Sequence, residues 1–188
     1  MSGKKIVIVL GSPREAGNSA LLAGQVAAGA ESCGAMVETF YLHGMHISPC
    51  RACEACHGAA ARGCVVADDM QVLYPKLREA DALVIATPIY WFTMSAQTKI
   101  FVDRCYALEG PGGNALKGKQ VAILLIYADP DALISGAVNA LRTFQDIFRH
   151  IGAEIVAMLH GSAGKAGAIR DNEELMEKAH ELGRRLAA

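Results

Sequence analysis

A run of apolar, mostly β-branched residues near the N-terminus constrains the fold more than any other feature of this 188-residue chain. It covers residues 5–10 (KIVIVL) and leads directly into a turn at residues 11–19 (GSPREAGNS). A nearly continuous apolar run is typical of a strand that is buried on both faces of a parallel sheet. Parallel strands need long crossover connections, so the run predicts an α/β domain.

Strand and helix signals alternate along the rest of the chain. Apolar runs predict five strands, at residues 5–10, 36–42, 81–86, 120–127 and 153–159. Helical spacing predicts five helices, at residues 19–32, 68–80, 95–107, 134–151 and 172–186. The second strand is the least apolar, so we expect it at an edge of the sheet. Two loops are expected, at residues 88–94 and at the Gly/Pro-rich, mobile residues 108–118. We therefore predict one doubly wound domain over residues 1–188, with helices on both faces of a five-stranded parallel sheet.

Composition and charge argue against several classes of partner. Hydrophobic residues make up 52% of the chain and charged residues 20%, and the formal net charge is −1. No basic surface for nucleic acid or an anionic membrane is predicted. No apolar run is long enough to span a bilayer, and the first residues do not form a signal peptide. We expect a cytoplasmic protein, in which six cysteines serve as metal ligands, redox groups or buried side chains rather than structural disulfides.

The turn after the first strand has the side chains of an anion site. Ser12, Arg14, Asn18 and Ser19 can all donate hydrogen bonds to phosphate oxygens, and the following helix adds unpaired N–H groups. The turn contains no lysine, and its glycine spacing is not that of a dinucleotide fingerprint. These residues predict a phosphorylated cofactor. An ordinary polar turn, in which Asn and Ser only cap the helix, is the alternative.

A cluster of aromatic residues follows the third strand. Tyr90, Trp91 and Phe92 are consecutive, and rings of this kind suit a flat ligand, although they can also fill the core or a subunit interface. In a doubly wound sheet the turns after the first, third and fourth strands meet at one edge. One ligand could therefore span the anion site and the aromatic turn. The segment after the second strand is expected on the same edge.

Together these motifs resemble the flavodoxin-like NADPH-dependent FMN reductase family, and within it the branch that includes the iron–sulfur flavoproteins. The matching segments are residues 11–19, the cysteines at 50–64 with the DDM that follows, TPIYW at 87–91, and the K-x-F-x-D-R pattern ending at Arg104. The resemblance implies strand order 2-1-3-4-5, noncovalent FMN, NAD(P)H as co-substrate, and a homodimer or homotetramer. It implies that the phosphate lies on Ser12, Arg14, Asn18 and Ser19. It places the isoalloxazine ring near Pro88, Ile89, Tyr90, Trp91 and Phe92, with Tyr127 as a further candidate.

The resemblance also implies a reaction. The protein would be an FMN-dependent oxidoreductase that passes electrons from NAD(P)H through FMN to an acceptor such as a flavin, a quinone or a protein. This chemistry belongs to the cofactor, so no catalytic acid or base is expected. Asp103 and Arg104 match a pair in the family, and we interpret them as a helical ion pair or a subunit contact.

Four of the cysteines are closely spaced. Cys50, Cys53, Cys56 and Cys64 form C-x2-C-x2-C-x7-C, which suits a [4Fe–4S] cluster, free or redox-active thiols, or a zinc ion. Cys33 and Cys105 are expected to be buried. Three functions therefore remain open: the reductase, an electron carrier that uses FMN and a cluster, and a non-catalytic flavodoxin-like domain with structural zinc.

Overall fold

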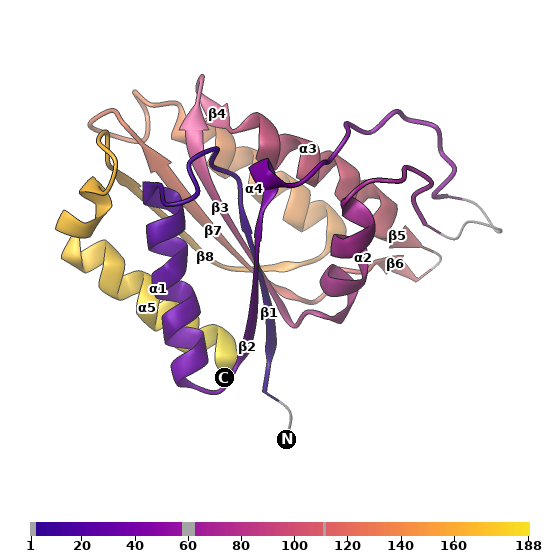
Figure 1. The fold of residues 1–188 in the computed structure, drawn as a ribbon, viewed down its shortest axis with the longest axis horizontal. Helices are drawn as coiled ribbons and strands as arrows, with labels where there is room; N and C mark the ends of the chain where they lie inside the picture. The colour runs from indigo at the N-terminus through magenta and orange to yellow at the C-terminus, as the bar shows by residue number, and fades with distance from the viewer. Residues whose placement is uncertain (1–2, 58–62, 111) are drawn as a thin grey trace.

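The computed structural model describes residues 3–57, 63–110 and 112–188. Its main sheet has the parallel strand order β2-β1-β3-β7-β8 (Figure 1). The strands are β1 (Lys5–Leu10), β2 (Met36–Tyr41), β3 (Ala82–Tyr90), β7 (Gln120–Tyr127) and β8 (Glu154–Ser162). This arrangement confirms the predicted five-stranded sheet of order 2-1-3-4-5, with the second strand at an edge.

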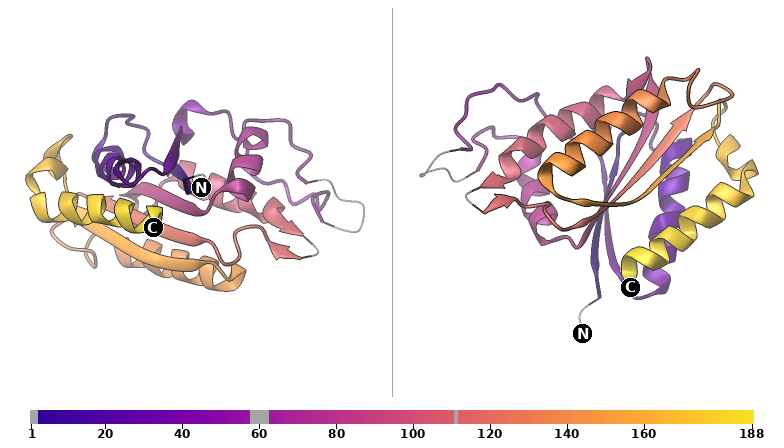
Figure 2. Two further views of the ribbon diagram at one scale, coloured as in Figure 1. Left: turned by 90° about the horizontal axis from the view of Figure 1, so that it is seen from below. Right: turned by 180° about the vertical axis from the view of Figure 1, so that it is seen from behind.

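Helices cover both faces of the sheet (Figure 2). One face carries α1 (Asn18–Ser32) and α5 (Glu173–Ala187), and the other carries α2 (Met70–Glu79), α3 (Ala96–Arg104) and α4 (Ala137–Ile151). Short 3-10 helices follow β2, α3 and β8, namely η1 (Leu42–Gly44), η2 (Cys105–Leu108) and η3 (Ala168–Asp171). Strand β7 is apolar after Gln120, because its successive side chains enter the two separate cores. No helix of the described residues is long and apolar enough to cross a membrane.

Both segments expected to be loops contain strands. Strand β3 continues to Tyr90 and pairs with the antiparallel β4 (Thr93–Met94), so residues 88–94 form a hairpin. Ile89, Tyr90 and Thr93 are residues that favour extended backbone, which the loop prediction overlooked. Within residues 108–118, β5 (Glu109–Gly110) pairs with β6 (Gly113–Asn114), while residue 111 lies outside the described residues. The expected mobility of that loop is not tested.

Two smaller expectations are wrong. Cys33 is exposed at the end of α1 rather than buried. Helix α4 begins at Ala137 and not at residue 134, because the Asp131 carboxylate accepts hydrogen bonds from the N–H groups of Leu133 and Ile134 and holds them in a turn.

Helices α1 and α5 pack closely because glycine occurs where they cross. A Cβ atom on Gly29 would lie 1.9 Å from the carbonyl oxygen of His180. A Cβ atom on Gly24, an exposed residue of α1, would meet nothing within 4 Å. Gly29→Ala should therefore lower the free energy of unfolding by about 1–3 kcal/mol through overpacking. Gly24→Ala should raise it by about 0.5–1 kcal/mol, because alanine favours helix. Urea denaturation measures the free energy of unfolding of both variants. Equal changes in the two variants would contradict the described packing of α1 against α5.

Candidate functional site

The loop between β1 and α1 is held in a defined shape by bonds within the protein. The Ser12 Oγ accepts a hydrogen bond from the Arg14 N–H at 3.0 Å, and the Gly17 N–H donates to the Arg14 carbonyl at 3.0 Å. The Tyr41 hydroxyl, at the end of β2, donates to the Pro13 carbonyl at 2.7 Å. Ser12 is buried, while the Arg14 side chain is exposed. The loop thus presents one cation beside a fixed backbone.

The first turn of α1 offers free backbone donors. Gly17 occupies the N-cap position and supplies no capping side chain, and the first turn contains no acidic residue. The first intrahelical bond runs from the Leu21 N–H to the Gly17 carbonyl. Within the described ranges, no acceptor is found for the N–H groups of Asn18, Ser19 and Ala20. Together with the positive end of the helix dipole, these donors favour an anion at this point.

Asn18 has a different set of partners from the phosphate contact expected of it. Its Nδ2 donates to the carbonyls of Ala163 and Lys165 at 2.9 and 2.7 Å, and its Oδ1 accepts from the Ile169 N–H at 3.4 Å. Asn18 therefore ties the segment after β8 to the start of α1. This tether brings Lys165 to the border of the anion site, and no local pattern of residues predicts that contact.

A buried cluster of hydroxyl groups joins the first loop to the aromatic turn. The Ser95 Oγ donates to the Gly11 carbonyl at 2.6 Å and lies 2.9 Å from the Thr98 Oγ1 and 3.2 Å from the Thr87 Oγ1. Thr87, Ser95 and Thr98 are fully buried. The Gly11 N–H also donates to the Ala86 carbonyl at 2.8 Å. This cluster was not predicted, although a serine directly before a helix is a recognisable N-cap signal.

The turn between β3 and β4 presents its aromatic side chains to the surface. Trp91 is 93% exposed and Phe92 is 57% exposed, and both have left-handed backbone, with φ of 51° and 70°. This conformation is strained for residues other than glycine. It is held by Asn139, whose Nδ2 donates to the Phe92 carbonyl at 3.1 Å, and by close contact of Phe92 with Gly136.

The other residues expected to contact the ring differ in their burial. Pro88 is buried in β3, Ile89 is half-buried, and Tyr90 is exposed before the turn. Tyr127 ends the neighbouring strand β7, is 7% exposed, and has its hydroxyl 3.1 Å from the His160 Nδ1. Burial, together with the nearby Asp131, raises the pKa of Tyr127 above its usual value. Because β1, β3 and β7 are adjacent, the structure brings their following loops to one edge, as expected.

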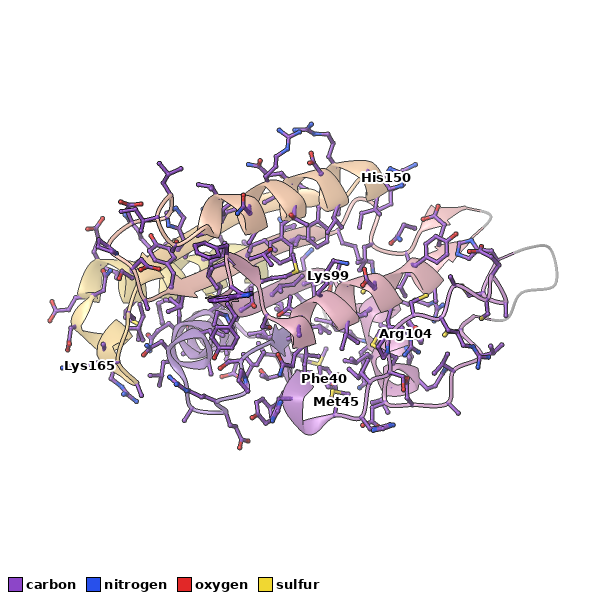
Figure 3. All side chains as sticks on the ribbon, turned by 90° about the horizontal axis from the view of Figure 1, so that it is seen from above. Phe40, Met45, Lys99, Arg104, His150 and Lys165 are labelled. Atoms are coloured by element: carbon purple, nitrogen blue, oxygen red, sulfur yellow. The ribbon has the colours of Figure 1, made fainter. Side chains whose placement is uncertain are left out.

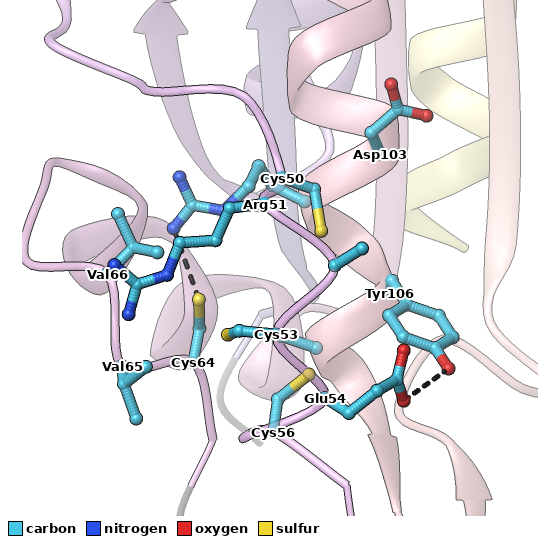
Figure 4. Close-up of a pocket in the computed structure, with 13 residues that line it drawn as sticks. Cys50, Arg51, Cys53, Glu54, Cys56, Cys64, Val65, Val66, Asp103 and Tyr106 are labelled. Carbon is cyan, nitrogen blue, oxygen red and sulfur yellow. Dashed lines mark hydrogen bonds between the residues drawn. The ribbon is translucent and has the colours of Figure 1, made fainter.

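The four closely spaced cysteines line a pocket. Cys50, Cys53, Cys56 and Cys64 surround one small pocket beside the end of α3 (Figure 4). The Tyr106 hydroxyl donates to the Glu54 carboxylate at 3.2 Å, and the Tyr106 ring stacks on His57 with centroids 4.1 Å apart. These contacts attach the cysteine segment to η2. Residues 58–62 of this segment lie outside the described residues.

The cysteine thiols have different electrostatic surroundings. The Ala55 N–H and the Arg51 side chain lower the pKa of Cys53. Burial raises the pKa of Cys56, and the neighbouring Cys64 raises it further. Cys64 is therefore close enough to Cys56 to disfavour its thiolate form.

Cysteine thiolates are ligands for both zinc ions and iron–sulfur clusters. Among the described residues, no three His, Cys, Asp or Glu side chains are grouped as they would be around one metal ion. In a four-iron cluster each thiolate binds a different iron, so the sulfurs are more widely spaced than around a single ion. Four cysteines line one pocket, and four thiolates are the ligand set of a [4Fe–4S] cluster, so the residues present fit that group chemically.

Arg104 and Asp68 form a buried ion pair at the wall of the cysteine pocket. Both side chains are 1% exposed, and the guanidinium makes two hydrogen bonds to the carboxylate. Asp103 instead pairs with Lys99 on the surface of α3. Asp103 and Arg104 therefore do not pair with each other, because successive helical residues point in different directions. The alternative expectation, a subunit contact, is not tested.

The anion site and the cysteine pocket lie at opposite ends of α3. Ser95 precedes this helix beside Gly11, while Arg104 ends it at the cysteine pocket. The nine residues of α3 span about 13 Å. Figure 3 likewise shows Lys165 and Arg104 toward opposite sides of the molecule. The cysteine pocket is thus not on the edge that carries the anion site, contrary to our expectation, because residues 45–57 run along α3 after leaving that edge.

Comparison with known proteins identifies the family. The model of the NADPH-dependent FMN reductase family matches residues 4–185. An iron-sulfur flavoprotein of Archaeoglobus fulgidus is 31% identical over 189 residues, which cover 97% of this chain and 79% of the relative. A putative NAD(P)H-dependent FMN-containing oxidoreductase of Bacillus subtilis is 27% identical over 96% of this chain and 97% of the relative. The chain belongs to the NADPH-dependent FMN reductase family and is an oxidoreductase.

A solved structure supports the fold. The NAD(P)H:quinone oxidoreductase of Methanothermobacter marburgensis matches with a TM-score of 0.75 and 17% identity, over 99% of this chain and 98% of that chain. At this identity the similarity concerns the fold alone, and it confirms the flavodoxin-like architecture.

Proposed function

We propose that the protein binds FMN at the edge formed by the loops after β1, β3 and β7, and uses it to pass electrons from NAD(P)H to a flavin, a quinone or a similar acceptor. The observation that carries this proposal is the set of free N–H groups at the start of α1, linked through the Ser95 cluster to the aromatic turn. When bound, FMN supplies the hydride-accepting group.

The residues of the chain have distinct tasks in this proposal. Arg14 and the N–H groups of Ser19 and Ala20 bind the phosphate, and the Ser12 hydroxyl fixes the loop through the Arg14 N–H. Tyr90, Trp91 and Phe92 form the surface against which the ring lies. Pro88 and Ile89 extend β3 beneath that surface, and Tyr127 supports it from the end of β7. Asn18 positions the segment that carries Lys165.

Arg14→Ala tests the phosphate contact. The arginine is exposed and has no ion-pair partner in the described parts of the chain, so the variant should fold normally. Loss of a hydrogen bond to a charged group costs about 1.5–3 kcal/mol. Because solvent screens the exposed Arg14, we expect a loss of binding free energy at the lower end of this range. FMN should therefore bind about tenfold more weakly. Titration of the apo-protein with FMN measures this. Arg184→Ala, at the far end of α5, should leave the affinity unchanged.

A second activity is favoured by the cysteine pocket. We propose that Cys50, Cys53, Cys56 and Cys64 bind a [4Fe–4S] cluster, so that the protein can also act as an electron carrier. All four line one pocket, and several relatives are named iron-sulfur flavoproteins. Iron and labile-sulfide analysis after anaerobic purification tests this: four of each per chain is the expected result. Zinc in their place would support the structural alternative, and neither metal would leave the thiols free.

We further propose that the protein acts in the cytoplasm as a homodimer or homotetramer, on a small-molecule or protein acceptor. Apolar side chains of the β3–β4 turn and of the segment before α4 support association between copies. Trp91, Leu133 and Ile134 are 93%, 76% and 58% exposed. Sedimentation of the FMN-loaded protein would contradict this proposal if only monomer were found at micromolar concentration.

A further inference from the structure

Arg104 joins the two ends of the segment that carries the cysteines. Its Nη1 donates to the Ser48 carbonyl at 2.8 Å, just before Cys50. Both of its Nη atoms donate to the Asp68 carboxylate, which follows Cys64. The Asp68 carboxylate also accepts from the Ser48 N–H at 2.9 Å. Arg104 is 2% exposed, so the guanidinium has one fixed position in the wall of the pocket.

One further donor of this guanidinium reaches a cysteine, and another has no partner among the described residues. The Nη2 donates to the Cys64 Sγ at 3.4 Å, as the dashed line at Cys64 in Figure 4 shows. The Nε is buried and has no hydrogen-bond partner in the part of the chain that the structure describes. A buried donor without an acceptor is unfavourable. A bound group that brings several sulfur acceptors into the pocket would provide an acceptor for the Nε and remove this cost.

We propose that Arg104 positions Cys64 as a ligand of the iron–sulfur cluster and donates N–H···S hydrogen bonds that raise the reduction potential of the cluster. This inference rests on the proposed cluster. Reduction adds negative charge to the cluster and makes its sulfurs better acceptors, so fixed donors stabilise the reduced state more than the oxidised state. Asp68 balances the charge of the guanidinium. The rise in the reduction potential of the cluster therefore depends on directed N–H groups rather than on the net charge of Arg104.

The Arg104→Lys variant separates these two contributions, because lysine keeps the charge but lacks the planar array of donors. The full chain, loaded with FMN and purified anaerobically, is titrated reductively while the cluster is followed by electron paramagnetic resonance. We expect about a tenfold loss in the equilibrium constant for reduction, which is a shift of 59 mV to lower potential for a one-electron couple. The flavin potential should not change, because the anion site lies at the other end of α3.

Arg149→Lys is the matched control. Arg149 is an exposed arginine in the last turn of α4, and it does not line the cysteine pocket. Its replacement should change the cluster potential by only a small fraction of the Arg104→Lys shift. An Arg104→Lys protein with full iron content and an unchanged potential would overturn the inference, as would an equal shift in both variants.

If the Arg104→Lys variant does not fold, the inference can still be tested on a protein that keeps the Arg104–Asp68 ion pair. The Arg51 side chain also reaches Cys53, so the Arg51→Lys protein is used to remove this second source of signal. It is labelled with 15N-arginine, and pulsed electron paramagnetic resonance is recorded on the reduced cluster. A 15N coupling from arginine is expected, and its absence would refute the assignment. If the unmodified protein contains no iron or labile sulfide, the cluster proposal and this inference both fail. Reduction of its FMN by NADPH would then still support the reductase.

Discussion

Ala16→Asp should weaken FMN binding by about 100-fold while leaving the fold intact. Ala16 is exposed in the loop before α1, directly before the N-cap residue Gly17. A new carboxylate there would face the phosphate, which carries about −1.5 to −2 charges. At an effective dielectric constant of about 20, unit charges about 5 Å apart repel by roughly 3 kcal/mol. The same carboxylate interacts favourably with the helix dipole, so the free energy of unfolding should not fall.

Ala16→Asn is the control for this experiment. It has nearly the same size as the aspartate variant and carries no charge, so its FMN affinity should stay close to that of the unmodified protein. The difference between the two variants should shrink as salt is added, because the site is open to solvent. Fluorescence titration with FMN measures both affinities. Equal binding by the two variants would mean that the phosphate does not lie at the start of α1.

Asp68→Ala should lower the free energy of unfolding by about 3–5 kcal/mol, because it leaves the buried Arg104 charge without its partner. The Asp68 carboxylate also accepts hydrogen bonds from the N–H groups of Ser48 and Met70. Asp103→Ala, which breaks only the exposed pair with Lys99, should cost no more than about 0.5 kcal/mol. Chemical denaturation compares the two. Similar small losses would show that the buried pair is not formed in solution.

The contribution of Asp68 to the free energy of unfolding should depend on pH. Burial alone would raise the pKa of this carboxyl, but hydrogen bonds from Arg104, Ser48 and Met70 outweigh burial and lower it. A lowered pKa in the folded state means that the stabilisation is complete above the ordinary aspartate value of about 3.9. It is then lost as the pH falls through the lower, folded-state value. The stability difference between the unmodified protein and Asp68→Ala should therefore be constant near neutrality and should shrink below about pH 4.

The sheet could be predicted from the sequence because its signals are local and strong. Apart from Lys5 and Gln120, residues 5–10 and 120–127 are apolar, and these predicted strands become β1 and β7 without change. The expected edge position of β2 followed from its polar residues. The hairpin of β3 and β4 could not be predicted in the same way, because its turn places Trp91 and Phe92 in left-handed backbone that aromatic residues rarely adopt.

The candidate site was predictable in its location but not in its internal contacts. Residue types alone placed Ser12, Arg14 and Ser19 at one helix start. The partners of Asn18 lie about 145 positions away in the chain, and a contact over that distance has no local signal. The same reason explains why Arg104 was assigned to its neighbour Asp103, when its partner is Asp68 on another segment.

A crystal structure of the FMN-saturated protein tests the central claim most directly. The account predicts that the phosphate accepts hydrogen bonds from the N–H groups of Ser19 and Ala20, with Arg14 beside it. It also predicts that the isoalloxazine ring lies against residues 88–92. Flavin density elsewhere, for example in the groove between α3 and α4 that contains Phe101 and Phe148, would contradict it.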